Sequence, residues 1–189
     1  MIPEDKIIKG CQAGKRKCQT QLYQRFAPIM LGVCMRYAPD RDAAEDILQE
    51  GFIKVFTRFD SFRGDGSLEG WIRRIIVNTA ISWVKQRQKT PFALDVDSLQ
   101  DKLADTEEEE ALQLIERVSP ETLMELIQTM PEGYRMVLNL FVFEGVSHKD
   151  IAELLQIAEN TSKSQLSKAR RWLRHNVLET EKKPIPELR

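Results

Sequence analysis

The sequence has no apolar run of about 18 residues, which is the length that a membrane-spanning helix needs. Its first ten residues, MIPEDKIIKG, also lack the apolar core of a secretory signal. Both absences argue against a membrane-inserted or exported protein. We therefore expect a cytoplasmic protein without membrane insertion.

Cysteine is scarce, and the recognised phosphate-binding motifs are absent. The spacing of the three cysteines fits no CxxC metal pattern, so we expect reduced thiols, with Cys34 in the core among apolar neighbours. The glycine-rich segment FDSFRGDGS, residues 59–67, matches neither GxxxxGK[ST] nor GxGxxG. The sequence thus predicts no bound metal and no cofactor.

Net charge is also small, at −1, because oppositely charged blocks cancel. Residues 71–89 contain five cations and no acid, whereas residues 95–116 contain nine acids and one base. Mapped along the chain, this pattern is compatible with nucleic-acid binding by part of the molecule.

The most informative segment is GVSHKDIAELLQIAENTSKSQLSKARRWLR, residues 145–174. Ser147 and Asp150 form a capping-box pattern, and apolar residues follow at helical spacing up to about Gln156. A break of about three residues precedes a second helix that begins near Asn160. Two short helices with so tight a turn predict a helix-turn-helix, whose second helix enters the DNA major groove.

The second of these helices has two unlike faces. One face should pack on the first helix and consists of Ser162, Leu166, Ala169 and Leu173. The other is polar, and residues 160–174 include five basic residues and no acidic one. An ordinary solvated basic helix is the alternative. The capping box, the short turn and the presence of basic but no acidic residues together favour DNA binding.

The first half of the chain predicts four further helices. They cover residues 5–13, a longer segment that ends at Tyr37 before Pro39, a segment from Asp40 or Asp42 to about Arg58, and residues 67–86. The helix up to Tyr37 carries the apolar residues Leu22, Phe26, Ile29, Met30 and Val33. The next helix has an apolar stripe of Leu48, Phe52, Val55 and Phe56, and a separate face of Asp46, Gln49, Glu50 and Ile53. No histidine or cysteine in that segment could assist the acids, so we do not expect an enzyme.

The helix over residues 67–86 should also have two sides. We expect its core side to be Leu68, Ile72, Ile75, Thr79 and Trp83. The opposite row consists of Arg74, Asn78, Ile81 and Lys85, with Trp71 at its edge. A row that mixes cations, an amide and apolar groups suits stacking and backbone contacts with unpaired nucleic acid, although a solvated surface with stray apolar residues is an equal alternative.

An acidic stretch with prolines at both ends predicts a flexible linker over residues 91–120. Beyond it, short helices start near Glu121 and at Pro131, and Gly145 is the expected C-cap of the latter. We expect an all-α protein with two small helical domains, residues 1–90 and 121–176, followed by a disordered tail over residues 177–189.

Four segments in this order resemble the extracytoplasmic-function (ECF) group of bacterial RNA polymerase sigma factors. They are AAEDILQEGFIKVF (43–56), GWIRRIIVNTAISWVKQ (70–86), MPEGYRMVLNLFVFEGVSHKDIAELL (130–155) and TSKSQLSKARRWLR (161–174). The resemblance implies sigma regions 2 and 4 in the two domains. It also implies promoter DNA and core RNA polymerase as partners, with an anti-sigma factor as a further one.

The resemblance implies roles for specific residues. The polymerase-docking face would be Asp46, Gln49 and Glu50. Capture of unpaired minus-10 DNA would fall to Phe62, Arg63, Gly64, Trp71, Arg74 and Asn78. The minus-35 duplex would be read by Thr161, Lys163, Ser164, Gln165, Lys168 and Arg171.

Some residues depart from the family pattern. Ala158 stands where a capping Ser or Thr is frequent, and Gln165 replaces a frequent arginine.

His148 and His175 are isolated in the sequence and are expected to be solvated.

Three other functions fit the sequence less well. A free-standing helix-turn-helix regulator would have no use for the docking face and the base-capture loop. A nuclease would need converging carboxylates or a set of metal ligands. A protein that only binds other proteins would not explain a helix that has basic residues and no acidic ones over residues 160–174.

Overall fold

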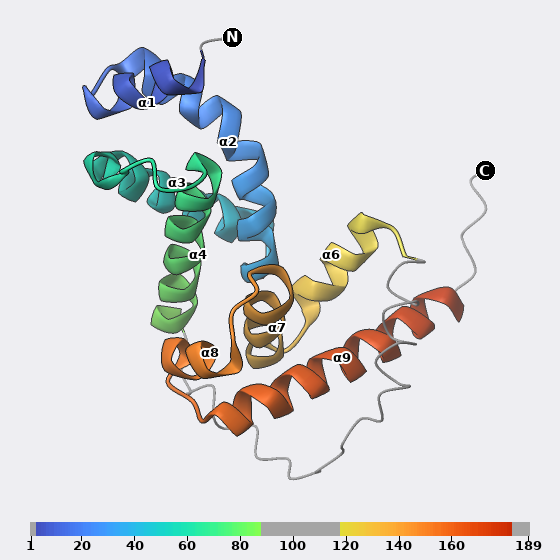
Figure 1. Ribbon diagram of the computed structural model, residues 1–189. Helices are drawn as coiled ribbons and strands as arrows, with labels where there is room; N and C mark the ends of the chain where they lie inside the picture. Colours follow the sequence, from blue (N-terminus) through green and yellow to red (C-terminus); the bar gives the residue numbers. More distant parts are fainter. Residues whose placement is uncertain (1–2, 88–117, 183–189) are drawn as a thin grey trace, which may run out of the picture. The chain divides into compact units, whose positions relative to one another are not determined.

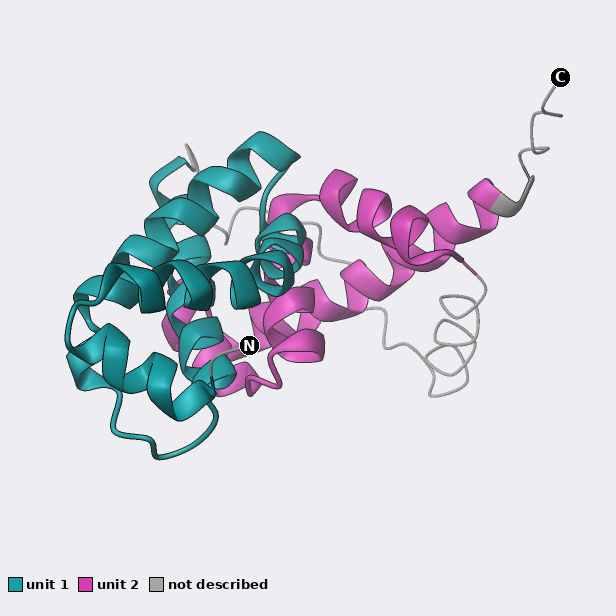
Figure 2. Ribbon diagram, turned by 90° about the horizontal axis from the view of Figure 1, so that it is seen from above, with its two compact units in different colours: residues 1–88 teal, residues 89–189 magenta. Residues whose placement is uncertain are grey.

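The computed structural model describes residues 3–87 and 118–182. The chain divides into two compact units, Met1–Gln88 and Lys89–Arg189, which Figure 2 colours separately. All regular structure in the described ranges is helical, with no strand, which confirms the predicted all-α fold. None of the described helices has the length and apolar character needed to cross a membrane.

Unit 1 is a bundle in which α2, α3 and α4 pack on one another and α1 packs on α2 (Figure 1). Its elements are α1 (Glu4–Gln12), α2 (Arg16–Tyr37), α3 (Arg41–Thr57), the 3-10 turn η1 (Phe59–Ser61) and α4 (Leu68–Arg87). The Asp40 side chain caps α3 by accepting a hydrogen bond from the Ala43 amide at 2.8 Å. The three long helices bury a shared core that includes Leu22, Met30, Tyr37, Ile47, Ile72 and Ile76.

The cysteines of unit 1 are all free and buried, and Cys34 is in the core as predicted. Burial raises the pKa of the Cys34 thiol to about 12. Burial and, to a smaller extent, the neighbouring Cys18 raise the pKa of Cys11 to about 11. These two side chains are therefore protonated at neutral pH and act as small apolar groups in the core.

Two isoleucines lie on the side opposite to the one expected. Ile29 on α2 was expected in the core but is 46% exposed, and Ile81 on α4 was expected at the surface but is only 5% exposed. Because α4 packs against both α2 and α3, its buried surface is wider than a single stripe. Ile75 and Trp83 lie at the margin of that surface and are only half-buried.

Unit 2 is built around one long helix. Its elements are α6 (Pro120–Thr129), α7 (Glu132–Leu138), the π-helical turn η3 (Asn139–Phe143), α8 (His148–Leu155) and α9 (Glu159–Lys182). Helices α6, α7 and α8 each pack against α9, and their buried side chains include Met136, Leu140, Ile151, Leu166 and Leu173. Gly145, with a φ of 65°, follows η3 and ends this helical segment as predicted.

The C-terminal tail begins later than the sequence indicates. Helix α9 continues to Lys182, and Val177 is fully buried in unit 2, so the prediction of disorder is wrong for residues 177–182. Residues 183–189 lie outside the described part of the chain. The predicted linker lies almost entirely outside it too, and its last residue, Pro120, begins α6.

Candidate nucleic-acid interface

Helices α8 and α9 form the predicted helix-turn-helix. The Ser147 hydroxyl accepts a hydrogen bond from the Asp150 amide at 3.2 Å and donates one to the Asp150 carboxylate at 2.6 Å. The carboxylate thus reaches back to the capping hydroxyl. Gln156 ends α8 in the left-handed conformation, with a φ of 58°, and α9 starts three residues later. This short turn fixes the direction in which α9 leaves α8.

His148 joins the two helices, contrary to the expectation that it is merely solvated. Its ring stacks on Phe141 with centroids 4.5 Å apart, and its Nδ1 lies 2.9 Å from the hydroxyl of Ser162 on α9. Burial, with a smaller contribution from Lys163, lowers the pKa of this histidine. The contact holds the start of α9 against α8. His175 is exposed, as expected.

The polar face of α9 presents most of the residues expected to read DNA. Lys163, Ser164 and Arg171 are exposed, and Thr161 and Lys168 are half-exposed. Lys163 forms an ion pair with Glu159 at 2.7 Å in the first turn. Hydroxyl groups near the start of the helix and cations further along suit base edges and phosphates, respectively.

Gln165 does not belong to this face. Its side chain is only 3% exposed and lies against Gly133 of α7, where an added Cβ would be 2.9 Å from the Gln165 Oε1. The glycine leaves room for the glutamine amide between α7 and α9. The expectation that Gln165 lies on the DNA-reading face is therefore wrong, and the sequence carries no local signal of its burial.

The loop between α3 and α4 rests on three aromatic rings. The Trp71 ring lies 5.5 Å from Phe59 and 5.3 Å from Phe62, measured between centroids. Phe62 was expected to contact DNA, but it is only 7% exposed because it packs between these rings. Trp71 is half-exposed and is the aromatic residue of the cluster that a base could reach.

A pocket of about 360 Å³ opens where this loop meets α4. Gly64 and Gly66 have φ values of 81° and 124°, which other residues rarely adopt, and they turn the chain around the pocket. The lining combines aromatic, cationic, hydroxyl and carboxylate groups. It consists of Ser61, Phe62, Arg63, Asp65, Gly66, Ser67, Gly70, Trp71 and Arg74. The structure thus brings together Arg63, Trp71 and Arg74, three of the residues that the resemblance assigns to minus-10 DNA.

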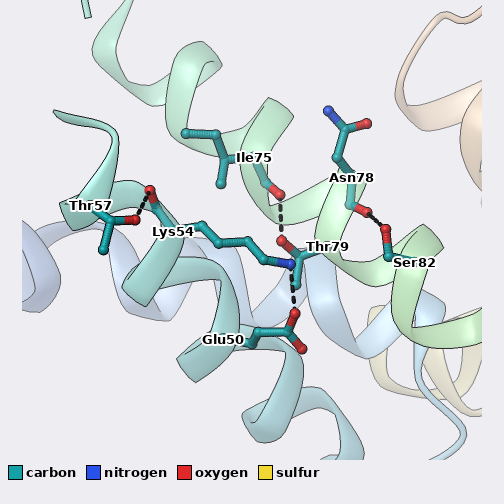
Figure 3. Close-up of polar contacts among 7 residues, drawn as sticks. All are labelled: Glu50, Lys54, Thr57, Ile75, Asn78, Thr79 and Ser82. Atoms are coloured by element: carbon teal, nitrogen blue, oxygen red, sulfur yellow. Dashed lines mark hydrogen bonds and ion pairs between the residues drawn. The ribbon is translucent and has the colours of Figure 1, made fainter. Parts of the chain in front are cut away.

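Asn78 lies one helical turn beyond Arg74, outside the pocket lining, and both side chains are exposed. In Figure 3 the Asn78 amide points away from α3, whereas the neighbouring Thr79 faces it. The Asn78 carbonyl accepts a hydrogen bond from the Ser82 hydroxyl at 2.9 Å. The exposed row on α4 is therefore Arg74, Asn78 and Ser82, while Ile81 is buried.

On α3, the four residues of the second face are all exposed. Ile53 is 63% exposed, on the same face as Asp46, Gln49 and Glu50. Glu50 pairs with Lys54 at 2.6 Å (Figure 3). A single exposed apolar residue is common on protein surfaces, so Ile53 alone does not identify a binding site.

Beside this face lies an apolar hollow that the sequence analysis did not anticipate. It occupies about 380 Å³ between α2 and α3 and is lined mainly by apolar residues. The lining is Tyr23, Gln24, Ala27, Pro28, Leu31, Glu45, Leu48 and Gln49. Gln49 belongs to both features, so the charged face and the hollow form one continuous surface.

Comparison with known proteins gives two family matches. Sigma-70 region 2 matches residues 22–90, and sigma-70 region 4 matches residues 120–173. The first range includes the pocket and the α3 face, and the second includes the helix-turn-helix.

Individual proteins match over almost the whole chain. The chain is 30% identical over 174 residues to the RNA polymerase sigma-H factor of Pseudomonas aeruginosa, covering 88% of this chain and 90% of that protein. It is 28% identical over 183 residues to the ECF RNA polymerase sigma-E factor of Escherichia coli, covering 93% and 95%. A solved structure of CnrH in complex with the cytosolic domain of CnrY aligns with a TM-score of 0.48 and 16% identity, covering 93% and 96%. The family matches and the full-length relatives show that this protein belongs to the ECF group of sigma-70-type RNA polymerase sigma factors.

Proposed function

We propose that the two units of this sigma factor divide promoter recognition between them: unit 1 binds core RNA polymerase and unpaired minus-10 DNA, and unit 2 binds the minus-35 duplex. As a sigma factor, the chain recognises promoters and initiates transcription. One observation supports this assignment of roles. The pocket beside α4, which suits a single base, lies in unit 1, and α9, which suits a duplex groove, lies in unit 2.

In unit 2, the exposed polar face of α9 enters the major groove. Thr161 and Ser164 are close to the start of the helix, where hydroxyl groups can reach base edges. Lys163, Lys168 and Arg171 provide cations for phosphates. The contact between His148 and Ser162 supports this role because it fixes the start of α9.

In unit 1, the pocket receives a base that has left the stack. Flipping a base costs a few kcal/mol, which stacking and polar contacts must offset. Trp71 offers an aromatic surface, and Arg63 and Arg74 offer charges for the flanking phosphates. Gly64 shapes the loop, and Asn78 contacts the strand next to the pocket.

The α3 face is the docking site for core polymerase. Asp46, Gln49 and Glu50 provide polar contacts there, and Ile53 and the hollow beside Gln49 provide apolar area. A polar rim around an apolar centre is the usual composition of a protein interface.

We further propose that the protein acts in the cytoplasm, makes or breaks no covalent bond, and is restrained by an anti-sigma factor. Membership of the ECF group supports each of these statements. In this scheme residues 1–90 form sigma region 2, residues 121–176 form sigma region 4, and residues 91–120 connect them.

Lys168→Ala tests the proposed role of α9. If Lys168 contacts a phosphate, the substitution should weaken binding of the full chain to duplex DNA almost uniformly across sequences. It should also make the slope of log affinity against log salt concentration shallower by about 0.9. Fluorescence anisotropy over a range of salt concentrations measures both quantities.

Lys9→Ala, which removes an exposed lysine on α1, is the matched control and should leave the slope unchanged. A loss confined to one DNA sequence would show that Lys168 reads a base. An unchanged slope would remove Lys168 from the interface altogether.

A further inference from the structure

The pocket between the loop and α4 contains one carboxylate, that of Asp65. The side chain is exposed, and it forms no hydrogen bond or ion pair with any other described residue. Arg63 and Arg74 line the same pocket without pairing with it. Asp65 is therefore available to a bound molecule.

A carboxylate is an unusual group in a pocket for nucleic acid. It repels the phosphates, so it lowers affinity unless the ligand compensates. An ionised carboxylate only accepts hydrogen bonds, so compensation requires a donor on the base. Charge-assisted hydrogen bonds of this kind are also about twice as strong as neutral ones.

The bases differ in the donors that they offer. Cytosine, adenine and guanine each carry an exocyclic amino group, at N4, N6 and N2 respectively. Unpaired thymine has no amino group, and its one ring donor, the N3–H, lies between two carbonyl oxygens that repel a carboxylate. We propose that Asp65 makes the pocket selective for an unpaired base with an exocyclic amino group and against thymine. This inference rests on the proposed capture of single-stranded DNA by unit 1.

The loop does not need the charge of Asp65 for its conformation. The residue lies between Gly64 and Gly66, whose positive φ values make the turn, and the Gly66 amide donates to the Gly64 carbonyl at 3.0 Å. Asparagine favours turns as aspartate does and has almost the same size. Asp65→Asn therefore removes the charge and adds a donor while the loop is retained.

The test uses the full chain and labelled single-stranded oligonucleotides with one test base flanked by abasic sites, with binding followed by anisotropy. Adenine is compared with purine, which lacks only the amino group, and cytosine is compared with thymine. The wild-type chain should bind the adenine oligonucleotide about 10-fold more tightly than the purine one. Asp65→Asn should reduce that ratio to below about 3-fold, because an amide can pair with either base.

Two further variants separate this inference from the proposed function. Asp60→Asn removes an exposed acid of η1 outside the pocket lining and should leave the ratio unchanged. Trp71→Ala should weaken binding of every oligonucleotide that carries a base, which tests strand capture itself. If the wild-type chain binds none of the oligonucleotides, strand capture by unit 1 is wrong.

Equal binding of adenine and purine by the wild-type chain, together with an effect of Trp71→Ala, would overturn the role of Asp65 and leave strand capture standing. A uniform gain in affinity for all bases in Asp65→Asn would also overturn it, because it would show that the carboxylate only repels phosphate.

Discussion

Reversing two charges on α3, in the double substitution Asp46→Lys and Glu50→Lys, is expected to weaken binding to core RNA polymerase by about 100-fold. Both side chains are exposed and belong to the face that also presents Gln49 and Ile53. Like charges brought together across an interface cost several kcal/mol, so a docking face should respond strongly. Equilibrium binding of labelled chain to purified core polymerase measures the effect.

The fold should tolerate this change. Glu50 loses its ion pair with Lys54, but exposed pairs at this helical spacing contribute only about 0.3–0.5 kcal/mol. Helical circular dichroism and the unfolding midpoint should therefore stay close to those of the wild-type chain. Normal polymerase affinity in the correctly folded variant would rule out docking through α3.

A matched control makes the same change in charge elsewhere on unit 1. Asp60→Lys and Glu69→Lys are exposed positions in η1 and in the first turn of α4. This pair should retain polymerase affinity within about 3-fold, since neither residue lies on the α3 face. An equal loss in both double variants would indicate a bulk effect of net charge.

Asn78→Ala is expected to slow promoter opening by about 10-fold while changing the initial binding of holoenzyme to the promoter by less than about 3-fold. The Asn78 amide is exposed one turn beyond Arg74, where a strand leaving the pocket would pass. A contact made only with unpaired DNA stabilises the open complex and contributes little to the closed one. A fluorescent base in the minus-10 element, followed by stopped flow, reports opening.

Ser82→Ala is the control for this experiment. Ser82 is exposed one turn further along α4, and its hydroxyl already donates to the Asn78 carbonyl. We expect opening at the wild-type rate in this variant. A larger loss in binding than in opening for Asn78→Ala would contradict strand capture and would indicate a contact with duplex DNA.

Features set by local interactions could be predicted from the sequence. The caps at Asp40 and Ser147 and the end at Gly145 depend on residues a few positions apart, so those helix limits agree with the structure. The apolar side of α9 also agrees, because Leu166, Ala169 and Leu173 repeat with the helical period.

Burial of individual site residues could not be predicted in this way, because it depends on distant neighbours. Gln165 is buried because Gly133, on another helix, leaves room for its amide. Phe62 is buried because Trp71 and Phe59 enclose its ring. A helical period says which residues share a face, but it does not say how wide the packed area is, which explains Ile81.

The pocket between the loop and α4 could not be predicted from the sequence either. Residues 61–67 read as a glycine-rich loop, and only the fold shows that Asp65 shares a pocket with Trp71 and Arg74 of α4. The extension of α9 has a similar origin. Glu179 and Lys182 fall in a polar segment, whereas the buried Val177 anchors this part of the helix to unit 2.

The proposal that each unit recognises one promoter element is tested most directly by transcription in vitro. Core polymerase transcribes genomic DNA with and without the purified chain, and the 5′ ends of the transcripts are mapped. With the chain present, transcripts should start at a defined set of sites that share two upstream sequence elements at constant spacing. Start sites identical to those of core polymerase alone would contradict it.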